Sequence, residues 1–365
     1  MTLIKSLLTL TAIVSVSAFA EPKTETYIED INVPWGMAWL PPSNGQAQGD
    51  MLVTERSGSL YRVRDGKIAA EIKGLPDIHA NGQGGLLDIE LHPQYDENGW
   101  IYLSYSSPEG EGKGSNTAII RGQLNGNRLT NIETLYKAEP NSRRGQHYGS
   151  RIEFDNRGML FFSIGERGDR DTNPQDLSRD GGKIYRLRDD GRIPQDNPFV
   201  SDKQAKPAIY SWGHRNPQGM ATHPTSGEIW IHEHGPRGGD EINIVKAGEN
   251  YGWPILSYGI NYIGTAFAEG TEREGYQSPI HYWDPSIAPS GMTFVTSDKY
   301  PEWQGKLLVG SLKFRYLVLC STTESAVTNT AIVMKDIGRV RNVKQGPDGY
   351  LYVATEGNGI LRLIP

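Results

Sequence analysis

Residues capable of binding a cation concentrate in one segment, 232–254, which reads HEHGPRGGDEINIVKAGENYGWP. It follows a short apolar run and sets glycines and prolines around the acidic pair Asp240 and Glu241. Such a turn can direct oxygen atoms at a hard cation, because ions such as Ca²⁺ prefer oxygen ligands. The segment therefore predicts a cation-binding loop.

A second group consists of basic residues set among small ones, in residues 213–220 (GHRNPQGM), 310–316 (GSLKFRY) and 338–353 (GRVRNVKQGPDGYLYV). Arg339 and Arg341 are two residues apart, so on a strand they face the same side. Arginines and a lysine converging on one channel would hold a polyanion, since guanidinium pairs with carboxylates in a bidentate manner. Alternatively, these could be ordinary surface residues. All of them lie at repeat ends, and this disfavours that interpretation.

Other patterns carry weaker signals. His232 and His234 share one face of a strand, but no third nitrogen ligand for a metal is near them in sequence. Asp169, Asp171 and Asn173 resemble the start of an EF-hand but lack its glycine and its glutamate, which favours a solvated acidic loop. The chain has no G-x-S-x-G, Walker A or H-E-x-x-H pattern.

The elements that must position these residues are short strands, because 43 glycines and 22 prolines interrupt runs rich in Val, Ile, Leu, Tyr and Trp. A glycine-bearing turn followed by a bulky strand recurs six times, at 49–63, 99–106, 158–168, 227–235, 305–312 and 349–364. Such spacing predicts an all-β, six-bladed propeller. A β-sandwich with coincidental turns is the alternative. The longest intervals lie between Met159 and Lys306, and we expect their loops to roof a site on the central channel.

The N-terminus reads as a secretory signal peptide over residues 1–20, with Lys5, an apolar run and an A-x-A cleavage site at Ala18–Ala20. The run is too short to span a membrane. No linker divides residues 21–365, so we expect one domain, exported most simply to a bacterial periplasm. Cys320 is the single cysteine, which excludes an intramolecular disulfide. The net charge of −6 argues against nucleic acid as a partner.

Taken together, these segments resemble the soluble dehydrogenases for glucose and aldose sugars that depend on pyrroloquinoline quinone (PQQ). The resemblance covers nearly the whole mature chain, and the sequence is most similar to the aldose sugar dehydrogenase branch. It is carried, in order, by NGQGGLLDIELHP, GQHYGSRIEFD, IGERGD, GHRNPQGM, EHGPRGGDEIN, NYGWP, APSGM, GSLK, and RVRNV before GPDGYLYV.

The resemblance implies a cofactor site, and PQQ carries three carboxylates and an ortho-quinone that need cations and a Lewis acid. The residues that match the family's cofactor-binding positions are Gln83, Arg215, Asn216, Lys313, Arg339 and Arg341. The carbonyls of Gly235 and Pro236 match the ligands of a calcium ion that also coordinates the quinone. A second, structural calcium is implied at Glu241 and the carbonyl of Tyr251.

The resemblance also implies the catalytic residues. His147 matches the general base that removes the proton from the C1 hydroxyl of an aldose as hydride leaves for PQQ, and an imidazole has a suitable pKa. Glu166 matches the acidic partner, usually Asp, that orients the imidazole. On its own, His147 would be read as a structural or surface histidine.

The sequence departs from the glucose enzyme at some positions, and there the residue roles of that enzyme do not carry over. Exact register puts His281 and Asp284 where that enzyme has aromatic residues over the cofactor, with Tyr282 and Trp283 adjacent, so the stacking residue stays unassigned. Shorter roofing loops predict an open cleft that accepts aldoses broadly, including disaccharides.

Two other classes of function stay open at this point. A calcium-dependent propeller lactonase would present inward Asp, Glu or Asn ligands, and a non-catalytic binding propeller would need no His147 and Glu166 beside an anion site. The chain has no C-x-x-C-H haem motif, so an external acceptor must take the electrons. Both a monomer and a homodimer fit the sequence.

Overall fold

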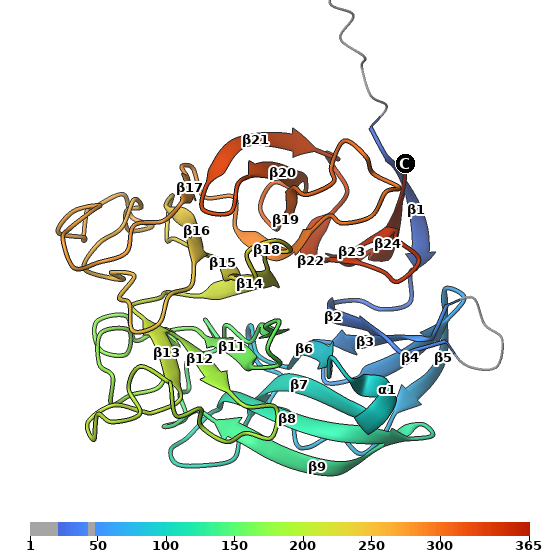
Figure 1. Cartoon of the computed structure of the whole chain (residues 1–365), viewed down its shortest axis with the longest axis horizontal. Helices are drawn as coiled ribbons and strands as arrows, with labels where there is room; N and C mark the ends of the chain where they lie inside the picture. The colour runs from blue at the N-terminus through green and yellow to red at the C-terminus, as the bar shows by residue number, and fades with distance from the viewer. Residues whose placement is uncertain (1–20, 43–47) are drawn as a thin grey trace, which may run out of the picture.

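The computed structural model describes residues 21–42 and 48–365, which form six four-stranded antiparallel sheets around a central axis (Figure 1). The prediction of an all-β, six-bladed propeller is confirmed. The predicted signal peptide, residues 1–20, lies outside the described residues. Among those described, no helix is long and apolar enough to cross a membrane.

Each of the first three sheets is a meander that runs from the channel outward. Their strands are β2 (Pro34–Trp39), β3 (Met51–Glu55), β4 (Leu60–Arg64) and β5 (Lys67–Ile72); β6 (Leu86–Leu91), β7 (Trp100–Ser107), β8 (Asn116–Asn125) and β9 (Arg128–Lys137); and β10 (Ile152–Phe154), β11 (Leu160–Ile164), β12 (Lys183–Leu187) and β13 (Ile209–Trp212). A single helical turn, α1 (Tyr95–Asn98), precedes β7.

The other three sheets complete the ring, and the last one takes its outer strand from the start of the chain. Their strands are β14 (Pro217–Thr222), β15 (Ile229–Glu233), β16 (Asp240–Ile244) and β17 (His281–Trp283); β18 (Pro289–Phe294), β19 (Leu307–Ser311), β20 (Leu317–Thr322) and β21 (Val327–Val333); and β22 (Arg339–Gln345), β23 (Leu351–Glu356), β24 (Gly359–Ile364) and β1 (Lys23–Ile28). The pairing of β1 with β24 closes the ring (Figure 1).

The six recurring sequence units correspond to one structural position. Each contains the second strand of a blade: β3, β7, β11, β15, β19 or β23. These strands are buried along most of their length, because neighbouring blades cover both of their faces. Apolar and polar residues therefore do not alternate along these strands, and the resulting runs of bulky residues made the repeat detectable in the sequence.

The hydrophobic core is divided into wedges between blades. Six apolar clusters each combine side chains of two adjacent blades, such as Leu52 with Ile101 and Trp230 with Phe294. Burial of this apolar surface is the main force that holds blade to blade, and the pairing of β1 with β24 joins the two ends of the ring by backbone hydrogen bonds.

The inner strands share an irregularity near their starts. The register against the second strand shifts close to the beginning of β2, β6, β14, β18 and β22. A β-bulge bends a strand and changes the direction of its side chains. Five of the six inner strands are therefore bent at the same end of the channel.

Candidate functional site

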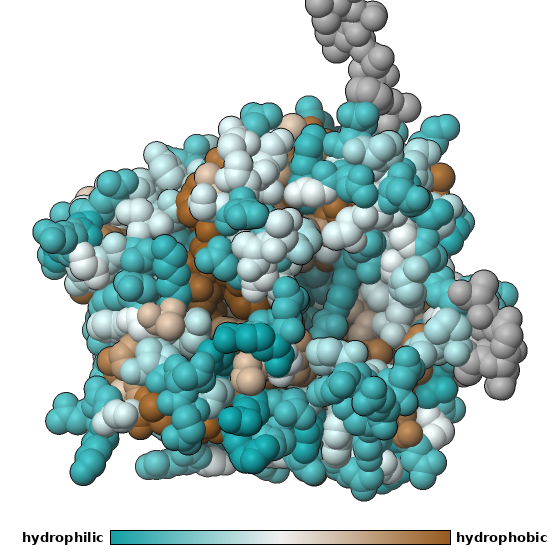
Figure 2. All heavy atoms as spheres, in the orientation of Figure 1, coloured by the Kyte–Doolittle hydropathy of each residue, from teal (hydrophilic) through white to brown (hydrophobic). Residues whose placement is uncertain are grey.

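Antiparallel strands bring two kinds of segment to one end of the propeller. The segment that enters an inner strand and the turn that leaves the second strand lie at the same end, because the two strands run in opposite directions. A cavity of about 600 Å³ lies at this end. Figure 2 shows this view of the molecule hollowed near its centre, within a mostly hydrophilic surface.

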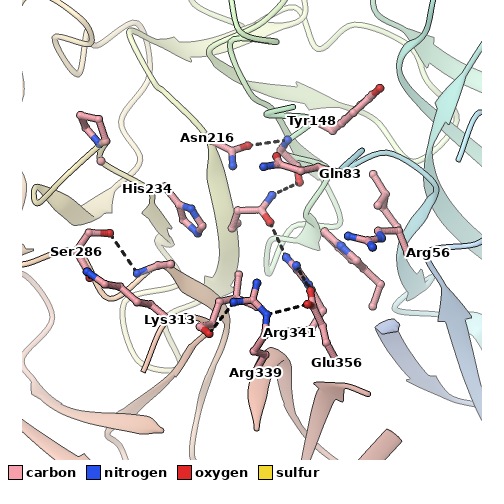
Figure 3. Close-up of a pocket in the computed structure, with 18 of the residues that line it drawn as sticks. Arg56, Gln83, Tyr148, Asn216, His234, Ser286, Lys313, Arg339, Arg341 and Glu356 are labelled. Atoms are coloured by element: carbon pink, nitrogen blue, oxygen red, sulfur yellow. Dashed lines mark hydrogen bonds and ion pairs between the residues drawn. The ribbon is translucent and has the colours of Figure 1, made fainter. Parts of the chain in front are cut away.

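The charged residues that line the cavity are mostly cationic, and part of the lining is drawn in Figure 3. Five of its lining residues carry a positive charge, whereas only one carries a carboxylate, Glu356. The positive ones are Arg56, Arg237, Lys313, Arg339 and Arg341. Arg56 and Arg237 form no ion pair within the described part of the chain, so the cavity has a surplus of positive charge.

Glu356, at the end of β23, joins the two arginines of β22. Arg339 donates Nε to Glu356 Oε2 at 2.9 Å, and Arg341 donates Nε and Nη2 to Oε1. Burial opposes the charge of Glu356, but the two guanidinium groups outweigh it and lower its pKa. Arg341 is buried and lies at a register shift of β22, while Arg339 is half exposed. Both arginines thus reach the same cavity, as their spacing predicted.

Lys313 approaches from the turn after β19. Its Nζ donates to the carbonyl of Ser286 at 3.0 Å, which fixes the ammonium group against the segment that enters β18. Arg339 adds a bond from Nη1 to the carbonyl of Leu312 at 3.1 Å. The three cations are therefore positioned on one wall by backbone oxygens and by Glu356 (Figure 3).

Gly235 and Pro236 line the cavity on the turn after β15. The amide of Gly235 donates to Asp240 Oδ1 at 2.8 Å, and Asp240 Oδ2 accepts from the amides of Ile287 and Ala288. Within the described residues, neither the carbonyl of Gly235 nor that of Pro236 accepts a hydrogen bond. Two oriented carbonyls without donors are suitable ligands for a hard cation.

Gln83 and Asn216 line the cavity and also order the chain around His147. Gln83 Oε1 accepts from the amide of His147 at 2.8 Å, and Asn216 Oδ1 accepts from the amide of Gly149 at 3.1 Å. His147 has a φ of 55°, a left-handed conformation that costs free energy for a residue with a side chain. These two amide side chains stabilise that strained turn.

His147 and Glu166 form a buried pair beside the cavity. His147 Nδ1 is hydrogen-bonded to Glu166 Oε1, and the two residues are 8% and 2% exposed. The amide of Glu166 donates to the carbonyl of Arg215 at 2.8 Å. With Nδ1 bound to the carboxylate, the neutral imidazole keeps its lone pair on Nε2, where it can accept a proton.

The pKa of His147 favours that neutral form. Burial lowers the pKa, the bond to Glu166 opposes this effect, and the charge of Arg215 lowers the pKa further. The net shift is downward, so the imidazole is unprotonated near pH 7. A histidine in this state is prepared to act as a general base.

A second, much smaller cavity lies beside the first, and it is lined by one residue predicted for the cofactor site and two predicted for a second calcium. Arg215, Glu241 and Tyr251 line it together with Glu233 and Gly235. Burial and the charge of Glu233 raise the pKa of Glu241 to about 8. Asn243 donates to both glutamates, and its own Oδ1 finds no donor among the described residues. Two adjacent carboxylates and an unpaired oxygen are suited to a cation.

The structure does not bring the two histidines of β15 and its turn into a metal site. His232 Nε2 lies 3.2 Å from the carbonyl of Gly291, and His234 Nε2 lies 2.6 Å from that of Pro289. Burial lowers both pKa values, that of His232 to about 3. No group of three or more His, Cys, Asp or Glu side chains in the described residues could hold a metal ion.

The aromatic candidates near β17 do not line the main cavity. His281 contacts Trp283 edge to face, and Tyr282 stacks on Tyr258 with ring centroids 4.0 Å apart. The aromatic residues that do line it are Trp35, Tyr148 and Tyr262. Tyr262 comes from the long connection 245–280 between β16 and β17, which sequence reasoning expected to roof the site.

Sequence reasoning missed several lining residues. Arg56 follows β3 and Glu356 ends β23, at positions that correspond to Glu166 after β11 and Gly235 after β15. Their position at the end of a recurring strand was therefore an available signal. Gln218 on β14 accepts from Arg341 Nη1 at 3.2 Å, but nothing in its local sequence indicates this contact.

Comparison with known proteins identifies the family of this chain. The sequence pattern of the glucose/sorbosone dehydrogenase family matches residues 31–363. The chain belongs to this family. It is 43% identical to the aldose sugar dehydrogenase YliI of Escherichia coli K12 over 94% of this chain and 93% of the relative.

Solved structures of the family have the same fold. The soluble aldose sugar dehydrogenase of Escherichia coli in its apo form matches with a TM-score of 0.87 and 41% identity, over 94% of this chain and 98% of the other. The PQQ-bound aldose sugar dehydrogenase of Streptomyces coelicolor matches with a TM-score of 0.74 and 27% identity, over 94% and 98% of the two chains. The predicted resemblance is therefore confirmed, and this glucose/sorbosone dehydrogenase family member is an oxidoreductase.

Proposed function

We propose that this protein oxidises the C1 hydroxyl of aldose sugars to lactones, with PQQ as the hydride acceptor and calcium as the activating ion. The observation that carries the proposal is the cavity with five cationic residues and one carboxylate, beside the neutral imidazole of His147 and its partner Glu166. An anionic cofactor with three carboxylates compensates such a surplus of positive charge. Two similar proteins, an aldose sugar dehydrogenase and a PQQ-bound aldose sugar dehydrogenase, support the same activity.

The residues of the cavity fit this cofactor. Arg339, Arg341 and Lys313 supply charged donors, and Gln83 and Asn216 supply amides. The unpaired carbonyls of Gly235 and Pro236 suit the calcium ion. When bound, PQQ supplies an ortho-quinone that takes up a hydride, and the calcium makes it a better acceptor. Arg215 lines the neighbouring small cavity and donates to the carbonyl of His234, so it orders the turn that precedes these ligands.

His147 acts as the general base in this proposal. Its imidazole, neutral near pH 7, removes the proton of the C1 hydroxyl while the hydrogen on C1 leaves as hydride. Glu166 holds the ring through Nδ1 and stabilises the imidazolium that forms. The left-handed turn at His147, fixed by Gln83, keeps the ring from swinging away.

We also propose a second, structural calcium between Glu241 and the carbonyl of Tyr251. The raised pKa of Glu241 supports it, because a bound cation would relieve the repulsion between this carboxylate and Glu233. The proposal also includes a single domain over residues 21–365, export to a periplasm and delivery of electrons to an external acceptor.

A dye-reduction assay on the purified protein tests the activity. An aldose panel is supplied with and without PQQ and calcium, and a chelator-treated sample serves as control. Activity that requires both additions supports the proposal. A folded protein that stays inactive in every condition contradicts it and favours the lactonase or the non-catalytic propeller, which lactone hydrolysis and ligand binding then separate.

A further inference from the structure

The tip of the long connection between β16 and β17 is an ordered turn at the cavity mouth. Asn261 and Thr265 close it, with the amide of Asn261 donating to the carbonyl of Thr265 at 2.9 Å and their side chains bonded at 3.1 Å. The amide of Gly264, whose φ is +90°, donates back to the carbonyl of Asn261 at 2.8 Å. The turn therefore has a defined shape although it lies on the surface.

Two arginines from opposite sides hold this turn in place. Arg237 exchanges two backbone hydrogen bonds with Ile260, at 3.2 and 3.3 Å. Arg170 donates Nη1 to Asn261 Oδ1 at 2.9 Å and lies 4.7 Å from the ring centre of Phe267. Arg237 follows the candidate calcium ligands, and Arg170 follows Glu166. The turn is thus fixed relative to both halves of the candidate site.

This anchored turn leaves two large side chains open to solvent. Tyr262 lines the cavity but is 70% exposed, and Ile263 is 85% exposed. The hydroxyl of Tyr262 has no hydrogen-bond partner among the described residues. An ordered loop that presents an unpaired aromatic ring at a cavity mouth is typical of a binding surface rather than of a structural contact.

The part of a substrate that contacts the Tyr262 ring follows from the proposed chemistry, so this step rests on the proposed function. Oxidation at C1 requires the reducing-end ring of a sugar to enter the cavity toward His147. Any further sugar unit must then extend outward through the mouth. The deep aromatic residues, Trp35 and Tyr148, are each only 2% exposed, so Tyr262 is the lining aromatic residue placed to meet such a unit.

We propose that Tyr262 is a specificity-determining residue that binds the second ring of a reducing disaccharide or oligosaccharide. The apolar C–H face of a pyranose stacks on the electron-rich face of a tyrosine, and this contact needs no hydrogen bond from the phenol.

The test compares Tyr262→Ala and Tyr262→Phe with the unchanged protein, all loaded with PQQ and calcium. For Tyr262→Ala, kcat/KM for maltose falls roughly tenfold through KM, whereas kcat/KM for glucose changes less than about twofold. Tyr262→Phe keeps the maltose value, because the ring face is retained. Equal losses for both sugars, or no loss for either, overturn the proposal.

Two further measurements separate this role from others. Calorimetric titration with methyl maltoside, whose blocked C1 cannot be oxidised, gives weaker binding to Tyr262→Ala than to the unchanged protein. A PQQ titration gives the same affinity for both, and a weaker affinity in the variant would overturn the proposal by making Tyr262 a cofactor contact. Glucose oxidation by the unchanged protein reports on the proposed function separately.

Discussion

The two ends of the channel use the same inner strands but carry different chemistry. At the site end, five cationic residues face one carboxylate. At the opposite end, a cavity of about 230 Å³ is lined by acidic and basic residues together. Lys344 pairs with Glu90 there, and burial with the charge of Glu90 raises the pKa of Glu153 to about 8, so that Glu153 is neutral at pH 7. Only the site end has charge left for a ligand.

Arg151 marks the boundary between the two ends. Its guanidinium lies 3.9 Å from the ring centre of Trp35 and donates to Asp88 and to the carbonyls of Gln218 and Arg341. It thereby connects the inner strands of five blades. The strands therefore provide a neutral frame, while bulges and turns at one end create the surplus charge.

The greatest loss of activity is predicted for the general base at the site end. His147→Ala should lower kcat by on the order of a hundredfold or more, because proton removal then depends on water. PQQ affinity should be largely unchanged, which a titration followed by absorbance checks. Loss of cofactor binding would instead make His147 a binding residue.

A smaller effect is expected for the cations, and it distinguishes the two ends. Arg339→Ala should weaken PQQ binding by about 1.5 to 3 kcal/mol, because a charged hydrogen bond is lost while Arg341 still pairs with Glu356. The matched control at the opposite end removes a whole ion pair, in the double variant Glu90→Gln and Lys344→Met. Equal cofactor titrations for all three proteins would contradict the assignment of the two ends.

The last prediction concerns stability rather than activity, at the wall between the ends, where His232 is bonded to Gly291. Its pKa is about 3 when folded, against about 6.5 unfolded, so the unfolded state binds an extra proton below pH 6.5. Stability relative to His232→Gln should therefore fall by about 1.4 kcal/mol per pH unit between pH 6 and pH 4. Urea unfolding at several pH values measures this difference, and parallel curves for the two proteins would exclude it.

The sequence predicted the elements that repeat and missed those that do not. The second strands are buried on both faces and so read as bulky runs, which indicated the six blades. β1 lacks that signal because its residues Lys23–Tyr27 are largely exposed. Its place beside β24 depends on ring closure, which no local pattern encodes.

The candidate site was predictable where residues follow a recurring strand or match a motif. Gln83, Lys313 and Arg341 line the cavity as expected. The aromatic residue at the mouth was not predictable, because it depends on how the connection 245–280 folds back. Alignment with the glucose enzyme pointed to His281 and Asp284. In the structure, the hydrogen bonds of Arg237 and Arg170 instead hold the turn with Tyr262 at the edge of the cavity.

The strand pair that closes the ring has a consequence for when the site can exist. β1 and β24 are separated by more than three hundred residues of chain, a contact of very high sequence separation that forms slowly. The cavity draws on every blade, from Trp35 on β2 to Arg341 on β22. A chain synthesised only as far as β21 therefore lacks Arg339, Arg341 and Glu356, so the complete cavity exists only once the last blade has been made.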